Sequence, residues 1–211
     1  MTIKPLADAE PDRLRLVIAS GNAGKVREFT ALLAALPLAI EAMPAGLEIE
    51  ETGSTFAENA RIKAIAVARA TGAWALADDS GLCVPALGGA PGVHSARYAD
   101  TDAARIARLL RELDGSGDRS AQFKAALALA KPNGAVAVEV EGCCPGQILE
   151  APRGEGGFGY DPVFYVPEAG LTFAEMDRTC KGRLGHRGRA FQLVLPQLQA
   201  LLAGETGATK R

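Results

Sequence analysis

Two adjacent carboxylates and a distant lysine are the residues of this chain that best suit phosphate chemistry. Asp78 and Asp79 follow the apolar run 74–77, and Lys25 stands in the segment VIASGNAGKVREF. Adjacent carboxylates repel each other where the dielectric is low, and a bound cation removes that cost. Mg²⁺ is held in proteins by a few carboxylate oxygens, waters and substrate phosphates. The pair therefore indicates a Mg²⁺ site that faces a polyphosphate.

The acidic pair has two candidate helpers and one plain alternative. Glu50 or Glu51, in the segment GLEIEETGSTF, would supply a further carboxylate to the metal. The alternative is a turn over residues 78–81, since Asp, Ser and Gly all favour turns. The dipeptide alone leaves both interpretations open.

The segment around Lys25 predicts a buried strand, a tight turn and a helix. Residues 14–19 are apolar, Ser20, Gly21 and Asn22 form the turn, and apolar residues from Val26 onward recur at helical spacing. Backbone N–H groups at such a helix start attract phosphate, and Lys25 adds a full charge. The spacing matches neither a Walker A loop nor a dinucleotide fingerprint. A helix-capping turn with a solvated lysine is the alternative.

A glycine-rich stretch with aromatic residues, RGEGGFGYDPVF, occupies residues 153–164. Its glycines permit close backbone approach, and Phe158 and Tyr160 offer faces on which a nucleobase could stack. A tight loop with one ring tucked into the core explains the same residues.

Residues 178–189 carry a concentration of positive charge without any acid. The charged or titratable members are Arg178, Lys181, Arg183, His186, Arg187 and Arg189. Such a segment attracts anions locally. A solvated surface loop and a nucleic-acid contact are the two alternatives.

Composition limits the class of protein. The 211 residues, 48% hydrophobic and 23% charged, suit one domain or two closely joined lobes. A net charge of −2 gives no general attraction to nucleic acid or to an anionic membrane. The four cysteines show no C-x-x-C motif, and the start of the chain lacks the apolar core of a signal peptide, so we expect a cytoplasmic protein with reduced thiols.

Periodicity predicts an α/β fold with a mixed sheet. The expected organisation is a flexible segment 1–12, a folded domain 13–202 and a flexible tail 203–211. The remaining expected elements are a helix opening at Thr55 with Glu58 in a capping box, a short strand 74–77 leading into the acidic pair, a helix capped at Thr101 or Asp102 and ended by Gly115, two antiparallel strands within 122–142, and a last helix over about 189–202.

Taken in order, these segments resemble the inosine/xanthosine triphosphate pyrophosphatases, also called the Ham1-like family. The matching segments are SGNAGKVREF (20–29), EETGSTFAENARIKA (50–64), ALADDSGLCVPALGGAPGVHSARYA (75–99), GEGGFGYDPVF (154–164), FAEM (173–176) and HRGRA (186–190). They cover most of the predicted domain, and the long middle segment makes the resemblance specific.

The resemblance implies Mg²⁺-dependent hydrolysis of deaminated purine triphosphates (dITP, ITP, XTP) to the monophosphate and pyrophosphate. It implies an elongated mixed sheet flanked by helices, two lobes around a central cleft, and a homodimer that needs neither nucleic acid nor a membrane.

Carried over by position, the family's site assigns roles to four groups of residues. Ser20, Gly21, Asn22, Ala23, Gly24 and Lys25 would hold the phosphates, and Ser80 would touch the substrate. Asp79 would be metal ligand and proton acceptor. The nucleotide would be lined by Phe158, Gly159, Tyr160, Asp161, Lys181, His186 and Arg187. From the residues themselves we expect Asp79 or Asp78 to activate water, Glu50 or Glu51 to help hold the metal, and Lys25 to stabilise developing charge.

Two positions depart from the family pattern, and two rival functions remain. Gly185 stands where family members commonly have serine, and Cys180 where an acidic or polar residue is usual. The rivals are a single-strand nucleic-acid-binding module that uses the basic run, and a nucleotide-binding regulator with a dead site. The retained Asp78, Asp79 and Lys25 argue against the regulator.

Overall fold

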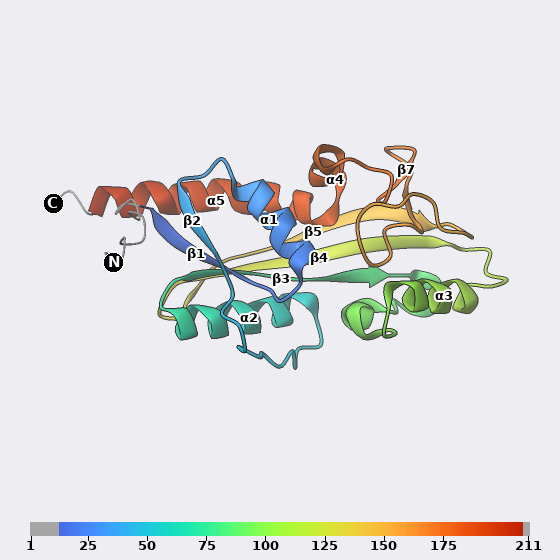
Figure 1. Cartoon of the computed structure of the whole chain (residues 1–211), viewed down its shortest axis with the longest axis horizontal. Helices are drawn as coiled ribbons and strands as arrows, with labels where there is room; N and C mark the ends of the chain where they lie inside the picture. The colour runs from blue at the N-terminus through green and yellow to red at the C-terminus, as the bar shows by residue number, and fades with distance from the viewer. Residues whose placement is uncertain (1–12, 209–211) are drawn as a thin grey trace, which may run out of the picture.

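The protein, described over residues 13–208 by a computed structural model, is built on one seven-stranded mixed sheet (Figure 1). The strand order is β2-β1-β3-β4-β5-β6-β7. The strands are β1 Leu14–Ala19, β2 Leu38–Ala42, β3 Trp74–Cys83, β4 Ser120–Ala130, β5 Val136–Ile148, β6 Phe164–Val166 and β7 Leu171–Thr172. β1 runs parallel to β2 and β3, and the other neighbours are antiparallel. The predicted α/β fold with an elongated mixed sheet is confirmed.

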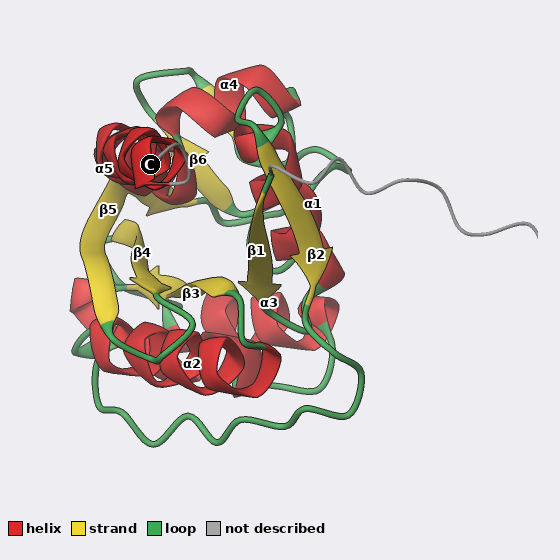
Figure 2. Cartoon of the chain, turned by 90° about the vertical axis from the view of Figure 1, so that its left-hand side faces the viewer, coloured by secondary structure: helices red, strands yellow, loops and turns green. Residues whose placement is uncertain are grey.

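Helices cover both faces of this sheet (Figure 2), with α2 on one face and α1 and α5 on the other. The helices are α1 Ala23–Leu33, α2 Phe56–Thr71, α3 Asp102–Glu112, α4 Arg178–Leu184 and α5 His186–Ala208, with short 3₁₀ turns η1 Pro85–Leu87 and η2 Gly92–Arg97. In the part of the chain that the structure describes, none of these helices has the length and hydropathy needed to cross a bilayer.

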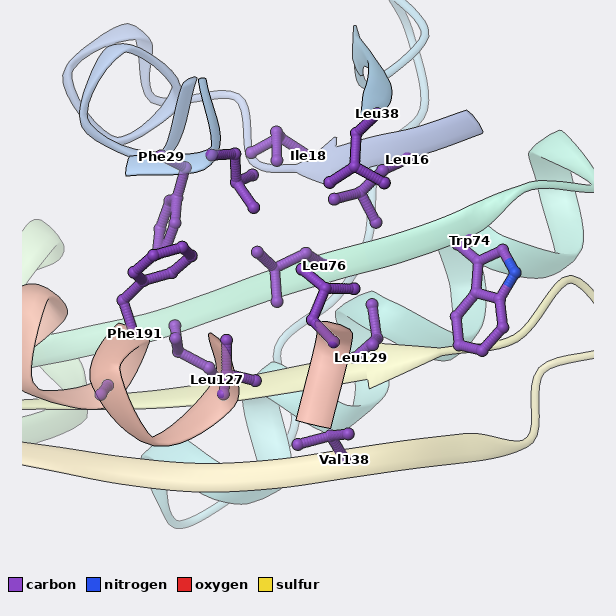
Figure 3. Packing of buried hydrophobic residues seen from close by; sticks show 14 of the residues in the cluster. Leu16, Ile18, Phe29, Leu38, Trp74, Leu76, Leu127, Leu129, Val138 and Phe191 are labelled. Carbon is purple, nitrogen blue, oxygen red and sulfur yellow. The ribbon is translucent and has the colours of Figure 1, made fainter. Parts of the chain in front are cut away.

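The alternation of side chains along β1 divides the core into two layers. Leu16 and Ile18 point to the face covered by α1 and α5, where they pack with Phe29 and Leu76 (Figure 3). The intervening Val17 and its neighbours face α2 across a layer made largely of alanine. Small residues let α2 lie close to the sheet, which brings its polar side chains near the strands.

A third core cluster lies at the other end of the molecule. It joins Leu82 of β3 to Ile106 and Leu109 of α3, and to Phe123 and Phe164 of the long antiparallel strands. The polar residues described below therefore lie where the first two core layers give way to the third.

Several predicted elements are confirmed. The strand at 14–19 is β1, Thr55 caps α2 with the reciprocal Glu58 capping box, and Thr101 caps α3. The hairpin is also present, since β4 and β5 pair antiparallel across a turn that ends at Gly134.

Other boundaries are corrected. The last helix begins at His186 and continues to Ala208, so it is longer at both ends than the predicted 189–202. The basic run 178–189 forms α4 and the start of α5, and is not a surface loop. Strands β2, β6 and β7 are not foreseen by the apolar pattern. The predicted flexible segment 1–12 lies outside the described residues.

The largest correction concerns the acidic pair. The strand predicted over 74–77 does not end before the aspartates, because β3 runs to Cys83 and pairs with β4 along that length. The interpretation of residues 78–81 as a turn is wrong. Cross-strand hydrogen bonding overrides the local turn preference of Asp, Ser and Gly here.

Candidate active site

The site is formed where β3 extends beyond the end of its parallel neighbour β1. β1 ends at Ala19, which pairs with Ala77, and from Asp78 onward that edge of β3 has no strand beside it. In open α/β sheets ligands bind at the carboxyl ends of the parallel strands. The opening makes residues on both faces of β3 reachable from one side.

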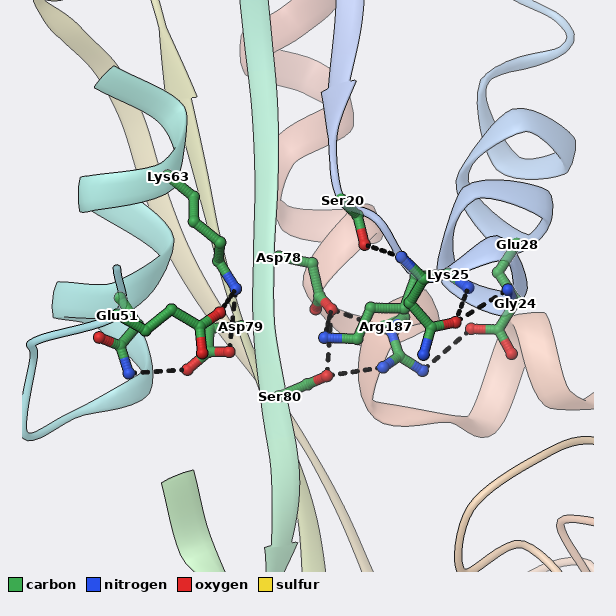
Figure 4. Close-up of polar contacts among 12 residues, drawn as sticks. Ser20, Gly24, Lys25, Glu28, Glu51, Lys63, Asp78, Asp79, Ser80 and Arg187 are labelled. Carbon is green, nitrogen blue, oxygen red and sulfur yellow. Dashed lines mark hydrogen bonds and ion pairs between the residues drawn. The ribbon is translucent and has the colours of Figure 1, made fainter. Parts of the chain in front are cut away.

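Because successive residues of a strand point to opposite faces, Asp78 and Asp79 diverge (Figure 4). Asp78 faces α1 and α5 and forms an ion pair with Lys25, in which Lys25 Nζ lies 2.8 Å from Asp78 Oδ2. Arg187 Nε approaches the same oxygen at 3.3 Å, and the Ser80 hydroxyl donates to it at 3.0 Å. The expectation that the two aspartates share one cation is therefore wrong.

An alternating chain of charges continues from Asp78 toward the glycine-rich loop. Arg187 Nη1 pairs with Glu28 Oε2 at 3.0 Å, and Lys181 Nζ lies 3.1 Å from Glu28 Oε1. Lys181 also donates to Asp161 Oδ2 at 2.6 Å. The predicted Lys25, Lys181 and Arg187 are thereby joined in one network.

Asp79 faces α2 and belongs to a second network (Figure 4). Lys63 Nζ lies 3.0 Å from Asp79 Oδ1 and 2.5 Å from Glu51 Oε1, so its ammonium group bridges two carboxylates. Asn59 Nδ2 donates to the other Asp79 oxygen at 3.2 Å. Glu51 also lies within ion-pair reach of Arg97.

The two aspartates differ in pKa. Burial would raise the pKa of Asp78, but the positive charges of Lys25 and Arg187 outweigh it and hold that pKa below its ordinary value. Burial raises the pKa of Asp79, and Lys63 offsets only part of the effect. Asp79 is thus the better proton acceptor of the two, since the conjugate acid of Asp78 is much stronger.

Two adjoining cavities open beside these networks. The first, about 420 Å³, is lined by Asp79, Ser80, Lys25, Lys63 and Glu51, together with Ser20, Gly21, Asn22, Gly24, Phe158, Gly159, Tyr160, Asp161, His186 and Arg187. The second, about 520 Å³, is lined by Phe158, Phe173, Met176, Lys181 and His186 among others. Both volumes are in the range of small-molecule sites.

The wall that the two cavities share contains Phe158, His186 and Arg187. Phe158 is half-buried, with Lys181 Nζ 5.0 Å from its ring centre. His186 stacks on Phe123, with centroids 4.7 Å apart, and neither of its ring nitrogens has a hydrogen-bond partner. Burial and the nearby Arg187 hold the pKa of His186 well below its ordinary value, so the ring is neutral.

Tyr160 does not offer a stacking face as predicted. Only 3% of the residue is exposed, and its hydroxyl donates to the Ser95 carbonyl at 3.0 Å. The alternative of one ring tucked into the core is thus correct for Tyr160, whereas Phe158 keeps the predicted access.

The turn before α1 is a helix-capping turn, as the alternative interpretation held, but it also places Lys25 in the site, as the phosphate-binding interpretation held. The Asn22 side chain accepts from the N–H groups of Gly24 and Lys25, so it caps the helix. Lys25 is not solvated, because its side chain is only 15% exposed and is paired with Asp78. Burial, the largest influence, lowers the pKa of Lys25 although Asp78 opposes it.

Three predicted site residues lie away from the cavity walls. Glu50 is exposed, whereas the neighbouring Glu51 lines the cavity and shares Lys63 with Asp79. Ala23 points to solvent, and the Asp78 carboxylate is buried behind Lys25 and Ser80.

Asp79 and Glu51 are the residues that suit a divalent cation. Within residues 13–208 no group of three or more His, Cys, Asp or Glu side chains is arranged for a metal. Two carboxylates nevertheless converge on the Lys63 ammonium, which stands where a cation would be attracted. This donor set fits Mg²⁺, because Mg²⁺ takes one or two carboxylates and completes its shell with water and phosphate.

Sequence reasoning missed Lys63, Asn59 and Glu28. Asn59 and Lys63 are four residues apart on α2 and so share one helix face, and Glu28 is three residues after Lys25 on α1. When one member of such a pair has been assigned to the site, the helical spacing predicts that the other member lies there too.

The known proteins that this chain resembles identify its family. A model of the Ham1 family matches residues 16–197. The chain belongs to the Ham1 family. A relative from Parasynechococcus marenigrum (strain WH8102), named dITP/XTP pyrophosphatase, is 64% identical over 190 residues, which are 90% of this chain and 97% of the relative.

Solved Ham1 structures have the same fold. A HAM1 protein from Coxiella burnetii is 44% identical with a TM-score of 0.80, and the match covers 89% of this chain and 99% of that one. The Ham1 protein of Staphylococcus aureus is 41% identical with a TM-score of 0.78, over 90% of this chain and 99% of that one.

Gly185, where the resemblance led us to expect serine, is packed closely against its own helix. It is the C-cap of α4, and a Cβ atom built there would lie 2.6 Å from the Lys181 carbonyl oxygen. A side chain at this position would require the backbone to shift. Glycine thus lets α4 and α5 meet at a tight junction that places Lys181 near His186.

Proposed function

We propose that this protein hydrolyses deaminated purine nucleoside triphosphates (dITP, ITP and XTP) to the nucleoside monophosphate and pyrophosphate, and so cleanses the nucleotide pool. The observation that carries the proposal is the convergence of Lys25, Lys63 and Arg187 with Asp79 at one cavity. Relatives named dITP/XTP pyrophosphatase support the same substrates.

In this proposal the triphosphate occupies the cavity between Lys25 and Lys63, and the base occupies the adjoining cavity against Phe158. Cationic side chains line both cavities, and the second cavity adds the apolar side chains of Phe173 and Met176 beside the shared Phe158. The phosphates are therefore assigned to the side of Lys25, Lys63 and Asp79, and the purine to the side where the apolar faces lie.

Asp79 accepts the proton of the attacking water. Its raised pKa makes it a stronger base than Asp78, and it lines the cavity. Lys25 and Lys63 stabilise the negative charge that develops on the phosphates, an effect worth a few kcal/mol per donor at an oxyanion site. Asp79 and Glu51 would hold Mg²⁺, which supplies charge neutralisation on the phosphate oxygens when bound.

Base selection falls to groups around the second cavity. Hypoxanthine and xanthine carry an oxygen acceptor at position 6, whereas adenine carries an amino donor there. The unpartnered N–H of His186 and the guanidinium of Arg187 are donors at the shared wall. Against adenine these donors would lack an acceptor, which is a strong basis for rejection.

The proposal is tested with a substrate panel of ITP, dITP, XTP, ATP and GTP in the presence of Mg²⁺. We expect kcat/KM for ITP to exceed that for ATP by at least about 10²-fold. Asp79→Asn should lower kcat with ITP by about 10²-fold or more, and the exposed Asp114→Asn should leave it unchanged. Equal rates on ITP, GTP and ATP, or full activity of Asp79→Asn, would contradict the proposal.

We further propose that the two ends of the sheet act as lobes around this cleft and that the protein is a cytoplasmic homodimer. The four cysteines are all free thiols, which suits a reducing compartment. Sedimentation equilibrium should give twice the 21.9 kDa mass of the chain. A monomer at micromolar concentration would contradict the dimer.

A further inference from the structure

The Asn59 side chain connects the two segments that carry the candidate metal carboxylates. It lies on α2, is 1% exposed, and donates through Nδ2 to Asp79 Oδ2 at 3.2 Å. Its Oδ1 accepts from the backbone N–H of Gly53 at 2.8 Å. Because a carboxylate only accepts and a backbone N–H only donates, these two partners fix the orientation of the amide.

The two segments differ in how firmly the backbone holds them. Asp79 is fixed by the β3–β4 ladder, in which it pairs with Ala126. Glu51 lies in a segment without regular secondary structure between β2 and α2. Its side chain is held by Lys63 and Arg97, which are themselves groups that a bound triphosphate would attract. The Gly53–Asn59 hydrogen bond, two residues away, does not depend on any charge.

Close packing reinforces this connection. A Cβ atom at Gly53 would lie 2.7 Å from Asn59 Oδ1 and 2.6 Å from Glu58 Cβ, so the segment can approach α2 only through a glycine. The residues next to Asn59 in the core layer are alanines, such as Ala60 and Ala64. A polar side chain buried among them is costly unless it is hydrogen-bonded. The two hydrogen bonds of Asn59 go to Asp79 and to Gly53, which lies two residues after Glu51.

The amide also complements Lys63. Lys63 contacts Asp79 Oδ1 and Asn59 contacts Oδ2, so together they fix the plane of the carboxylate. The amide is neutral, so it orients Asp79 without competing with a cation for its charge.

We infer that Asn59 is a positioning residue: it holds the Asp79 carboxylate and the Glu51 segment at the mutual distance that a divalent cation requires. The inference rests on the proposed function for the identity of the cation. Groups that orient metal ligands typically change metal affinity by 10- to 100-fold when removed.

The test compares Asn59→Leu and Asn59→Ser with Thr55→Ala, using Mn²⁺ as the probe. Leucine has nearly the same shape but removes both hydrogen bonds, and serine is too short to span both partners. Thr55→Ala removes the N-cap of the same helix, so it lowers the melting temperature without touching Asp79. Mn²⁺ affinity is measured by electron paramagnetic resonance, stability by thermal melting, and kcat and KM with ITP.

We expect both Asn59 variants to weaken Mn²⁺ binding about tenfold and to lower kcat, with KM for ITP within about twofold of the wild type. Thr55→Ala should bind Mn²⁺ as the wild type does. If one Asn59 variant does not fold, the other decides. Wild-type Mn²⁺ affinity in a folded Asn59 variant, or no Mn²⁺ binding by the wild type, would overturn the inference. Loss of Mn²⁺ affinity in a protein that does not hydrolyse ITP would support the positioning role and refute the proposed function.

Discussion

At the residue scale, two adjacent aspartates acquire opposite properties because a strand sends them to opposite faces. Asp78 is almost fully buried and is compensated by Lys25 and Arg187. Asp79 is ion-paired with Lys63, which it shares with Glu51, and its other oxygen accepts from the neutral Asn59 amide. A carboxylate that is well paired contributes to stability, whereas one that is incompletely paired is available for chemistry.

This contrast predicts different stabilities for the two asparagine variants. Asp78→Asn removes the counter-charge of the buried Lys25 and leaves Arg187 with Glu28 alone, and we expect it to lower the free energy of unfolding by about 3–5 kcal/mol. Asp79→Asn should cost less than about 1 kcal/mol, because burial already disfavours its charge. Urea unfolding followed by the fluorescence of the single tryptophan, Trp74, measures both. Equal losses in the two variants would contradict the assignment.

His186 predicts a pH dependence of stability. Its pKa in the folded protein lies well below the ordinary 6.5, so on acidification the unfolded chain takes up a proton that the folded protein does not. Stability that is present above pH 6.5 is therefore lost as the pH falls below it, by up to about 1.4 kcal/mol per pH unit.

His186→Phe should remove this component, since a phenyl ring can stack on Phe123 in the same place. We expect its free energy of unfolding to fall less steeply than that of the wild type between pH 6.5 and pH 5. Parallel curves for the two proteins, measured by urea unfolding at each pH, would show that His186 does not titrate as described.

At the element scale, the site depends on how closely α5 approaches the sheet. A Cβ atom at Gly142 of β5 would overlap the His186 carbonyl oxygen and the backbone nitrogen of Ala190. The first turn of α5, which carries His186 and Arg187, therefore rests directly on the strand. Glycine at this position sets the depth at which both side chains enter the cavities.

Gly142→Ala should push this turn away from β5. We expect it to lower the free energy of unfolding by about 1–3 kcal/mol, as overpacking does, and to raise KM for ITP. Gly117→Ala is the matched control, because nothing lies within 4 Å of its Cβ position. The prediction fails if both variants have wild-type stability and KM.

The elements also show how far sequence reasoning reaches. Strand β1, the Thr55 cap and the β4–β5 hairpin follow from local patterns, which the structure confirms. The path of β3 does not, because residues 78–81 carry turn signals and only pairing with the distant β4 keeps them extended. The split of the aspartates, and the preference for Glu51 over Glu50, depend on that pairing. Pairing between strands that are distant in the sequence produces no periodic pattern of residues, so it cannot be predicted from one sequence.

At the scale of the whole molecule, a chain of net charge −2 brings four cations from separate helices to one place. Lys25, Lys63, Lys181 and Arg187 come from α1, α2, α4 and α5, and each is paired with a carboxylate. The site is thus nearly neutral within the folded protein. The paired carboxylates reduce the repulsion between the four cations, which can therefore lie close together in the folded state.

This balance predicts the effect of metal removal. Because the Lys63 ammonium bridges Asp79 and Glu51, this carboxylate pair stays compensated in the metal-free protein. We expect the chelator EDTA to abolish ITP hydrolysis but to change the melting temperature by less than about 2 °C relative to Mg²⁺ without nucleotide. A fall of 10 °C or more in EDTA would mean that a metal is needed to hold the fold.

The measurement that tests the central claim most directly is ³¹P nuclear magnetic resonance of ITP incubated with the protein and Mg²⁺. The proposed site predicts that IMP and pyrophosphate appear together, in equal amounts and without IDP, and that Asp79→Asn produces neither at a comparable rate. IDP with inorganic phosphate as products, or no hydrolysis by the folded protein, would contradict the claim that these residues form a pyrophosphatase site.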